Sequence, residues 1–225
     1  MYQQPYRPSA LFGAFPPVIK NLLIINGLVF MAQQVPFINQ ELLRWFALWP
    51  NTSLFGYSTV ATFLPWQLVT YGFLHGGFTH LLFNMFALWL FGMRIEQAWG
   101  SRRFAIYYFL CVIGAGLVQL LVATASAANG QVYPTVGASG GVFGLLLAFA
   151  MLYPNEYIIL LFPPIPIKAK WFVIIFGTLE LFYGVTGTQV GVANFAHLGG
   201  MVFGYLLIQY WRGKLPMQPK RRMYT

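Results

Sequence analysis

The chain alternates between long apolar runs and short connections that hold most of its polar residues. A helix needs about 20 mostly apolar residues to cross the roughly 30 Å hydrocarbon core of a membrane. Six runs approach that length, so the pattern predicts an all-α, polytopic membrane protein with six spanning helices. The expected spans are residues 18–35, 67–91, 104–125, 139–153, 171–186 and 192–211. They form one membrane domain, 18–211, between an N-terminal tail, 1–17, and a basic C-terminal tail, 212–225.

Composition supports this class and excludes another. Only 8% of the residues are charged and 58% are hydrophobic, whereas soluble domains have about 25% charged residues. The formal net charge of +9 could indicate nucleic-acid binding, but no basic stripe interleaved with polar residues is present. The basic residues instead lie in the connections between apolar runs, so we expect a lipid bilayer and not nucleic acid as the partner.

The placement of the basic residues predicts an orientation, because lysine and arginine favour the cytoplasmic side of a membrane. On one side of the six predicted spans only Arg44 is basic. The basic residues of the other side are Arg7, Lys20, Arg94, Arg102, Arg103, Lys168, Lys170, Arg212, Lys214, Lys220, Arg221 and Arg222. We therefore expect a multi-pass protein of the cell (inner or plasma) membrane with both termini cytoplasmic.

The fourth span is short and begins at Ser139. At 1.5 Å per residue, its 15 residues, 139–153, cover about 22 Å of the roughly 30 Å core. If its inner end lies at the cytoplasmic interface, Ser139 lies several ångströms below the outer surface. Irregular backbone at that depth must be buried in protein or line a wet cavity. The pattern therefore predicts a small hollow, open to the outer side, with Ser139 at its floor.

Four polar residues fall at membrane depth, where an unpaired polar group costs free energy: Ser139, His80, Asn84 and His197. His80 and Asn84 are four residues apart and share one helix face. His197 lies about six residues, or roughly 9 Å, from the outer end of the last span. Ser139 and His197 are thus expected at matching depths, although depth alone does not bring them into contact.

Other interpretations of these residues stay open at this stage. A serine in a membrane helix commonly packs or bonds its own backbone, and glycines four apart are typical of closely packed helices. The run "GASGG" also fits the G-x-S-x-G elbow of soluble hydrolases, but neither the α/β context nor an aspartate is present. A metal site of His75, His80 and His197 is possible, but it lacks an H-x-x-x-H spacing or a nearby carboxylate.

Three motifs in this order, "HGGFTHLLFNM" at 75–85, "GASGGVFG" at 137–144 and "AHLGG" at 196–200, resemble the rhomboid family of intramembrane serine proteases. The resemblance covers all six predicted spans. It implies cleavage of the transmembrane segments of other proteins by a Ser–His dyad that opens to the outer side, without a cofactor or metal.

The resemblance also assigns residue roles. Ser139 would be the nucleophile and His197 its general base, while His80, Asn84 and the Ser139 backbone N–H would form an oxyanion hole. The positions expected to pack the active site are Phe143, Gly137 and Gly140, and those expected to be structural are Gly92 and Glu96, from "GMRIE", and Gly200.

The chain departs from the family pattern at two positions. Phe143 stands where tyrosine is common, and Trp66-Gln67 stands where the first outer loop often has Trp-Arg. No acidic residue is expected at the outer depth of the last two spans, so no third catalytic member is predicted. Glu180 is left without a role beyond pairing within the bundle. His75 is expected to point away from His80, toward loop structure or substrate.

The long connection 36–66 is rich in aromatic residues, which favour membrane interfaces. We expect it to be partly helical and to lie on the outer leaflet, and we expect the fifth span to be the more mobile gate. Two other functions are weighed against proteolysis. One is a non-catalytic rhomboid-like protein that binds helical clients, and the other is a small transporter, which would need polar residues through to the inner side.

Overall fold

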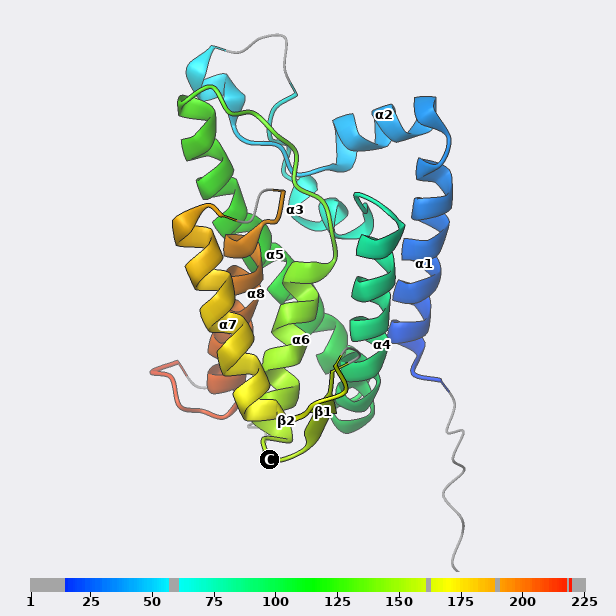
Figure 1. The fold of residues 1–225 in the computed structure, drawn as a ribbon, viewed down its shortest axis with the longest axis vertical. Helices are drawn as coiled ribbons and strands as arrows, with labels where there is room; N and C mark the ends of the chain where they lie inside the picture. Colours follow the sequence, from blue (N-terminus) through cyan, green and yellow to red (C-terminus); the bar gives the residue numbers. More distant parts are fainter. Residues whose placement is uncertain (1–14, 57–60, 161–162, 189–190, 218, 220–225) are drawn as a thin grey trace, which may run out of the picture.

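Six helices of the computed structural model stand side by side as a bundle (Figure 1). The structure describes residues 15–56, 61–160, 163–188, 191–217 and 219. The bundle helices are α1 (Pro17–Gln33), α4 (Phe78–Trp99), α5 (Ser101–Ala128), α6 (Ser139–Leu152), α7 (Ala169–Thr186) and α8 (Asn194–Trp211). The predicted all-α polytopic membrane fold is confirmed. Most of the predicted tails, 1–14 and 220–225, lies outside the described residues.

Shorter elements fill the connections. Helix α2 (Pro36–Phe46) crosses the end of the bundle beside α1 (Figure 1), and a 3₁₀ turn (Thr52–Phe55) follows it. The first long connection is therefore partly helical, as expected. A hairpin not predicted from the sequence joins α6 to α7, with strands β1 (Tyr157–Ile159) and β2 (Pro166–Lys168) paired antiparallel.

The predicted second span, 67–91, is wrong in its position. Residues of its first part form the short helix α3 (Gln67–Thr70) and a 3₁₀ turn (Tyr71–Phe73), and α4 begins only at Phe78. Residues 74–77 separate these elements, and two of them, Gly76 and Gly77, are glycine, which is a poor helix former. At its other end α4 continues to Trp99, and Glu96 in its last turn is buried in contacts with α1.

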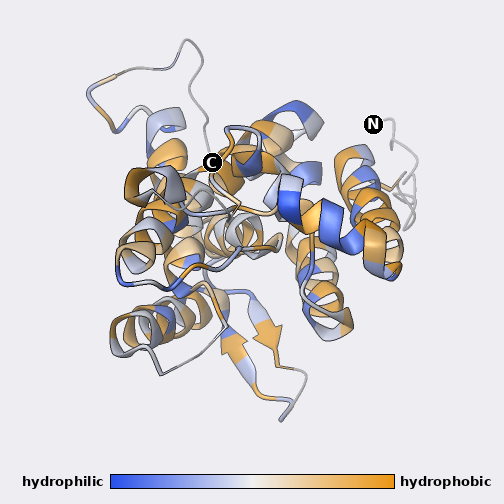
Figure 2. Ribbon diagram, turned by 90° about the horizontal axis from the view of Figure 1, so that it is seen from above, coloured by the Kyte–Doolittle hydropathy of each residue, from blue (hydrophilic) through white to orange (hydrophobic). Residues whose placement is uncertain are grey.

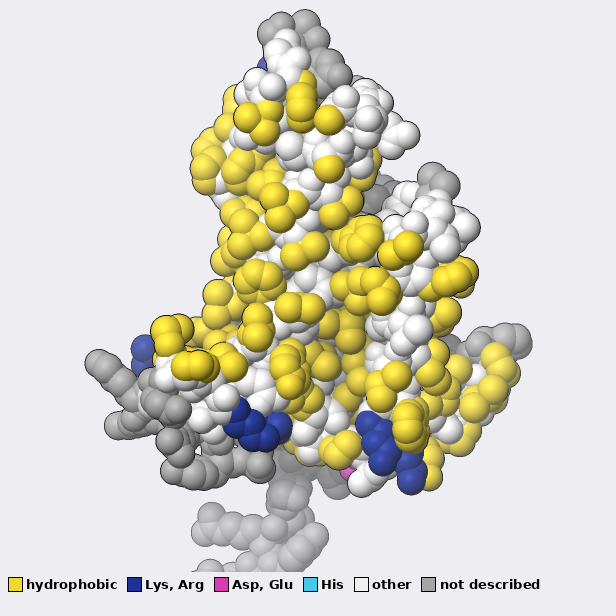
Figure 3. All heavy atoms as spheres, turned by 90° about the vertical axis from the view of Figure 1, so that its left-hand side faces the viewer, with side chains coloured by type: hydrophobic (Ala, Val, Ile, Leu, Met, Phe, Trp, Pro, Cys, Tyr) yellow, Lys and Arg dark blue, Asp and Glu magenta, His cyan; other side chains and the backbone are white. Residues whose placement is uncertain are grey.

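The bundle has the surface of a membrane protein. Three described helices, α4, α5 and α7, are long and apolar enough to cross a membrane by length and composition, and α1 and α6 are shorter apolar helices. Seen from above, the bundle helices are largely hydrophobic, whereas α2 has several hydrophilic residues (Figure 2). In side view hydrophobic side chains cover most of the height of one face, and the lysine and arginine side chains gather mostly near its lower end (Figure 3).

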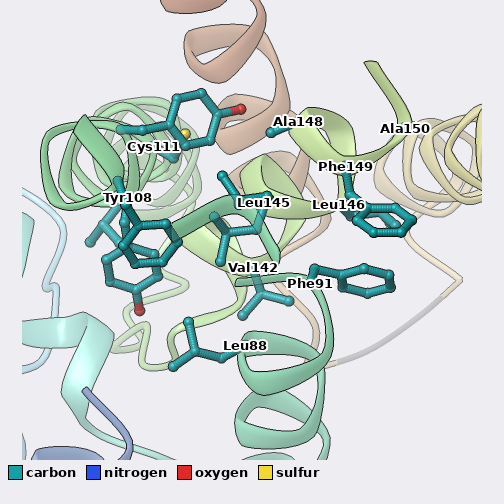
Figure 4. Packing of buried hydrophobic residues seen from close by; sticks show 14 of the residues in the cluster. Leu88, Phe91, Tyr108, Cys111, Val142, Leu145, Leu146, Ala148, Phe149 and Ala150 are labelled. Atoms are coloured by element: carbon teal, nitrogen blue, oxygen red, sulfur yellow. The ribbon is translucent and has the colours of Figure 1, made fainter. Parts of the chain in front are cut away.

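Helix α6 is the centre of the bundle, and it starts at a lower level than α4 starts and α5 ends (Figure 1). Its apolar side chains interlock with those of the helices around it (Figure 4). Leu145 of α6 and Leu88 of α4 are both fully buried, as is Cys111 of α5. Ser139 is the first residue of α6, so the short helix places this residue inside the bundle, below the level at which α4 starts and α5 ends (Figure 1).

Glycines allow the close approach of α6 to α5 and α8. A Cβ atom on Gly200 of α8 would overlap the backbone carbonyl of Gly140. A Cβ atom on Gly144 would lie 2.7 Å from the Cβ of Cys111. The hydroxyl of Tyr107 donates to the Gly144 carbonyl at 2.7 Å. These backbones therefore meet with no room for side chains, as in small-xxx-small packing.

Glu96 joins the end of α4 to the start of α1. Its carboxylate accepts the backbone N–H groups of Val18, at 3.0 Å, and Ile19, at 2.9 Å. It also accepts the hydroxyl of Ser101 at 2.6 Å. The first N–H groups of a helix have no partner within the helix, and the helix dipole there favours a negative charge. Gly92, one turn earlier, leaves room for Ile19 and Phe104.

We expect Glu96→Ala to lower the free energy of unfolding by about 2–4 kcal/mol, because two buried N–H groups lose their acceptor. Thermal unfolding in detergent measures the change. Glu41→Ala is the matched control, since Glu41 is partly exposed and accepts from the exposed Trp45 indole; its effect should stay within about 0.5 kcal/mol. Equal effects of the two substitutions would contradict the capping role of Glu96.

Candidate active site

The hydroxyl of Ser139 and the imidazole of His197 are in contact. Ser139 begins α6, and His197 lies in the first turn of α8. The distance from Ser139 Oγ to His197 Nε2 is 2.8 Å. The histidine is buried, whereas Ser139 is partly exposed. The glycine contacts between α6 and α8 one turn deeper hold these two helix ends together.

Phe143 covers one face of the imidazole. The two rings are parallel within 6°, with centroids 4.2 Å apart. Phe143 lies one turn after Ser139 on α6, so both side chains lie toward the same part of α8. This stacking restricts rotation of the His197 ring, and a phenylalanine does so without a hydroxyl.

A carboxylate approaches the other nitrogen of the same imidazole, and this corrects a sequence expectation. Glu180 Oε2 lies 2.9 Å from His197 Nδ1. The oxygen lies off the direction of the ring N–H bond, because Nδ1 has no partner that meets hydrogen-bond geometry. Sequence reasoning left Glu180 in the middle of its span and expected no acidic residue at this depth. Glu180 in fact lies six residues before the end of α7 at Thr186, a depth that matches His197.

His80 lies beside the start of α6. Its Nδ1 accepts the backbone N–H of Gly76 at 3.3 Å, so a neutral ring has its proton on Nε2. A Cβ atom on Gly137 would lie 2.8 Å from this Nε2 and 3.6 Å from Ser139 Oγ. Gly137 also has φ +129°, which side chains rarely adopt. Glycine is thus needed there for its conformation and for the space.

Asn84 lies one turn below His80 on α4 and is buried. Its Nδ2 donates to the backbone carbonyl of His80 at 2.9 Å. An amide has two N–H groups, so this bond uses one of them.

A Cβ atom on Gly140 would contact Ala115 and lie 3.3 Å from the Tyr71 hydroxyl, which shows how closely the floor of the site is packed.

The expectation that His75 points away from His80 is wrong. His75 precedes α4 rather than lying on it, so helical spacing does not apply. Its ring packs edge-on against His80, with centroids 5.1 Å apart. Gln33, the last residue of α1, fixes the backbone of His75 by accepting its N–H at 3.0 Å and donating to its carbonyl at 3.2 Å.

Gln67 anchors the first long connection, in the place where the family pattern has arginine. Its side chain is fully buried. Its Oε1 accepts the backbone N–H groups of Trp49 and Leu64 at 3.2 and 3.1 Å. The indole of Trp66 donates to the carbonyl of Trp45 at 2.9 Å.

Within the part of the chain that is described, no three histidine, cysteine or acidic side chains form a group that could hold a metal.

The rhomboid domain model matches residues 63–213, two thirds of the chain. The chain belongs to the rhomboid family. The match includes the motifs with Ser139, His197, His80 and Asn84, and this confirms the family assigned from those motifs.

Three relatives from a plant, a bacterium and a yeast are similar in sequence to this rhomboid. RHOMBOID-like protein 4 of Arabidopsis thaliana is 32% identical over 63% of this chain and 33% of its own length. Rhomboid protease GluP of Bacillus subtilis is 32% identical over 62% and 25%. Rhomboid protein 1, mitochondrial, of Saccharomyces cerevisiae is 31% identical over 70% and 45%. The match covers less than half of each relative, and only one of these three names states protease activity.

Sequence reasoning on this rhomboid missed Glu180 and Asn194. Asn194 Nδ2 donates to Glu180 Oε2 at 2.7 Å, one turn before His197 on α8. A signal for Glu180 was present, because an ionisable residue at membrane depth marks a functional site by default. Counting residues from the outer end of its span, as was done for His197, would have given both the same depth.

Proposed function

We propose that this rhomboid is an intramembrane serine endopeptidase, which hydrolyses peptide bonds in or near the transmembrane segments of other membrane proteins. The observation that carries the proposal is the 2.8 Å contact between Ser139 Oγ and His197 Nε2. A serine is a weak nucleophile until an adjacent base accepts its proton. The protease named among the relatives adds support at the level of the family.

In the proposed reaction His197 Nε2 takes the proton of Ser139 as Oγ attacks the scissile carbonyl. The imidazole then gives this proton to the leaving amine, which breaks the peptide bond and leaves an acyl-enzyme on Ser139. A water molecule, deprotonated by the same imidazole, then releases the acyl group. No cofactor is required for this sequence.

The oxyanion that forms during attack would lie at the start of α6. Ser139 is the first residue of that helix, so unpaired N–H groups and the positive end of the helix dipole are directed there. The second donors would be His80, through Nε2–H, and Asn84, through its remaining amide N–H. Loss of one such donor typically costs about 10²–10³ in rate.

We further propose that the site opens to the outer side of a cell membrane. Lys20 at the start of α1, Lys168 beside the start of α7 and Arg212 after α8 lie at the end of the bundle opposite the dyad. Lysine and arginine favour the cytoplasmic side. Both termini would then be cytoplasmic, and substrates would enter laterally from the bilayer.

The proposal is tested by incubating the protein in lipid vesicles with a panel of single-span substrate segments and, separately, with a fluorophosphonate. Cleavage and a covalent adduct on Ser139, located by mass spectrometry, are expected for the unaltered protein, and both should be lost in His197→Ala. Absence of cleavage and of the adduct in the unaltered protein would reject proteolysis in favour of the client-binding alternative.

A further inference from the structure

Glu180 is an acidic residue at membrane depth that the proposed dyad does not use. A carboxylate in that environment is costly unless it is paired. Its side chain is only 12% exposed. One oxygen of its carboxylate contacts α8 twice, at 2.9 Å from His197 Nδ1 and at 2.7 Å from Asn194 Nδ2.

The contact of Glu180 with α8 lies in a part of α7 that has no buried side chains. The buried residues of α7 are Ala169, Phe172 and Val173, all in its first five positions. Beyond them α7 has no buried residue and approaches α8 through partly exposed side chains. The end of α7 nearest the dyad thus meets α8 without buried side chains of its own, through the polar contacts of Glu180 and the packing of the Phe195 ring beside Gly184.

The contacts form a chain of four side chains. Asn194 holds Glu180 Oε2, this oxygen lies against Nδ1 of His197, and Nε2 of the same ring contacts Ser139 Oγ. A carboxylate beside Nδ1 favours the tautomer with its proton on Nδ1, which leaves the lone pair of Nε2 free to accept from serine. It also stabilises the positive imidazolium that forms when the serine proton is transferred.

We propose that Glu180 is a positioning residue for His197, which makes the site a Ser139–His197–Glu180 triad rather than a dyad. The inference rests on the proposed protease function. Glu180 acts through His197 and does not touch the reacting atoms. Because the carboxylate comes from α7, the third member is supplied by a different helix from either dyad residue.

The test compares Glu180→Gln with Glu156→Gln, a matched control whose carboxylate lies at the surface, 3.7 Å from Arg94. Glutamine keeps the size of Glu180 and can still accept from Asn194 but has no charge. We expect Glu180→Gln to lower kcat about 10- to 100-fold with KM and the thermal midpoint within experimental error. This loss is smaller than for soluble triads, where it reaches about 10⁴-fold, because Phe143 also orients the ring. The control should match the unaltered protein.

A purely structural tie between α7 and α8 predicts a different result. Glu180→Gln would then keep kcat within about twofold, or lose kcat only in proportion to its loss of folded protein, and either outcome overturns the proposal. Cleavage by the unaltered protein that depends on Ser139, together with such a result, would reject the triad and leave the protease function intact. Absence of any cleavage would instead reject the protease function.

A second measurement determines the tautomer of His197 in the unaltered protein. The chain has three histidines, so ¹⁵N-histidine labelling gives few NMR signals, and the His197 signal is assigned by its absence in His197→Ala. The triad predicts that neutral His197 has its proton on Nδ1. A proton on Nε2 would overturn it.

Discussion

Ser139→Ala is expected to lower the rate of peptide-bond cleavage by about 10⁴-fold or more, since the proposed nucleophile is removed. The fold should be unaffected. Ser139 is partly exposed at the first position of α6, and alanine is the best helix former. Initial rates on a single-span substrate in vesicles measure the loss, and the thermal midpoint measures the fold.

Ser126→Ala is the matched control for this substitution. Ser126 is also a helical serine, on α5, and its hydroxyl donates to the backbone carbonyl of Val122 at 3.1 Å. This bond lies within α5 and involves no residue of the proposed site, so cleavage should stay at the unaltered rate. Full activity in Ser139→Ala would show that any observed cleavage comes from a contaminant or from other chemistry.

Gly200→Ala is expected to have a large effect on folding. One added methyl group would overlap the backbone carbonyl of Gly140, and a backbone cannot move aside as a flexible side chain does. Helices α6 and α8 must therefore separate, at a cost of about 3 kcal/mol in the free energy of unfolding. The separation would also draw His197 away from Ser139, so the protein that remains folded should cleave more slowly.

Gly27→Ala tests whether the cost comes from the contact and not from helix propensity. Gly27 lies within α1, and a Cβ atom placed on it meets nothing within 4 Å. The same added methyl group should there be neutral or stabilising by up to about 1 kcal/mol, because alanine favours helix more than glycine. Thermal unfolding and cleavage rate, measured on both variants in one detergent, give the comparison. A similar loss at both positions would reject the close-packing explanation.

The prediction of separate helices from the sequence succeeded where a local property decided the outcome. Apolar length identified the bundle helices, and the short run beginning at Ser139 placed this residue inside the bundle. The start of α4 was misplaced by eleven residues, at Phe78 rather than Gln67. Apolar residues recur through 67–74, and a stretch of non-helical backbone from Leu74 to Gly77 separates the two parts.

The site divides in the same way. Residue type and depth indicated Ser139, His197, His80 and Asn84. A polar residue at membrane depth is costly and therefore marks a functional site, and its depth can be counted along its own span. Motif order then assigned the chain to the rhomboid family, which the domain match confirms. The catalytic roles of these residues remain predictions for the experiments above.

Contacts between helices depend on how each helix is rotated about its axis and how closely it approaches its neighbour, and no local pattern specifies either. The packing of Gly140 against Gly200 sets the distance between α6 and α8. The rotation of α7 turns Glu180 toward His197 rather than toward lipid. The sequence by itself determined the membrane class, the bundle helices and the residues that could react. Only the tertiary structure decided which of them meet, because a separation of a few ångströms between side chains of different helices arises from packing of the whole bundle.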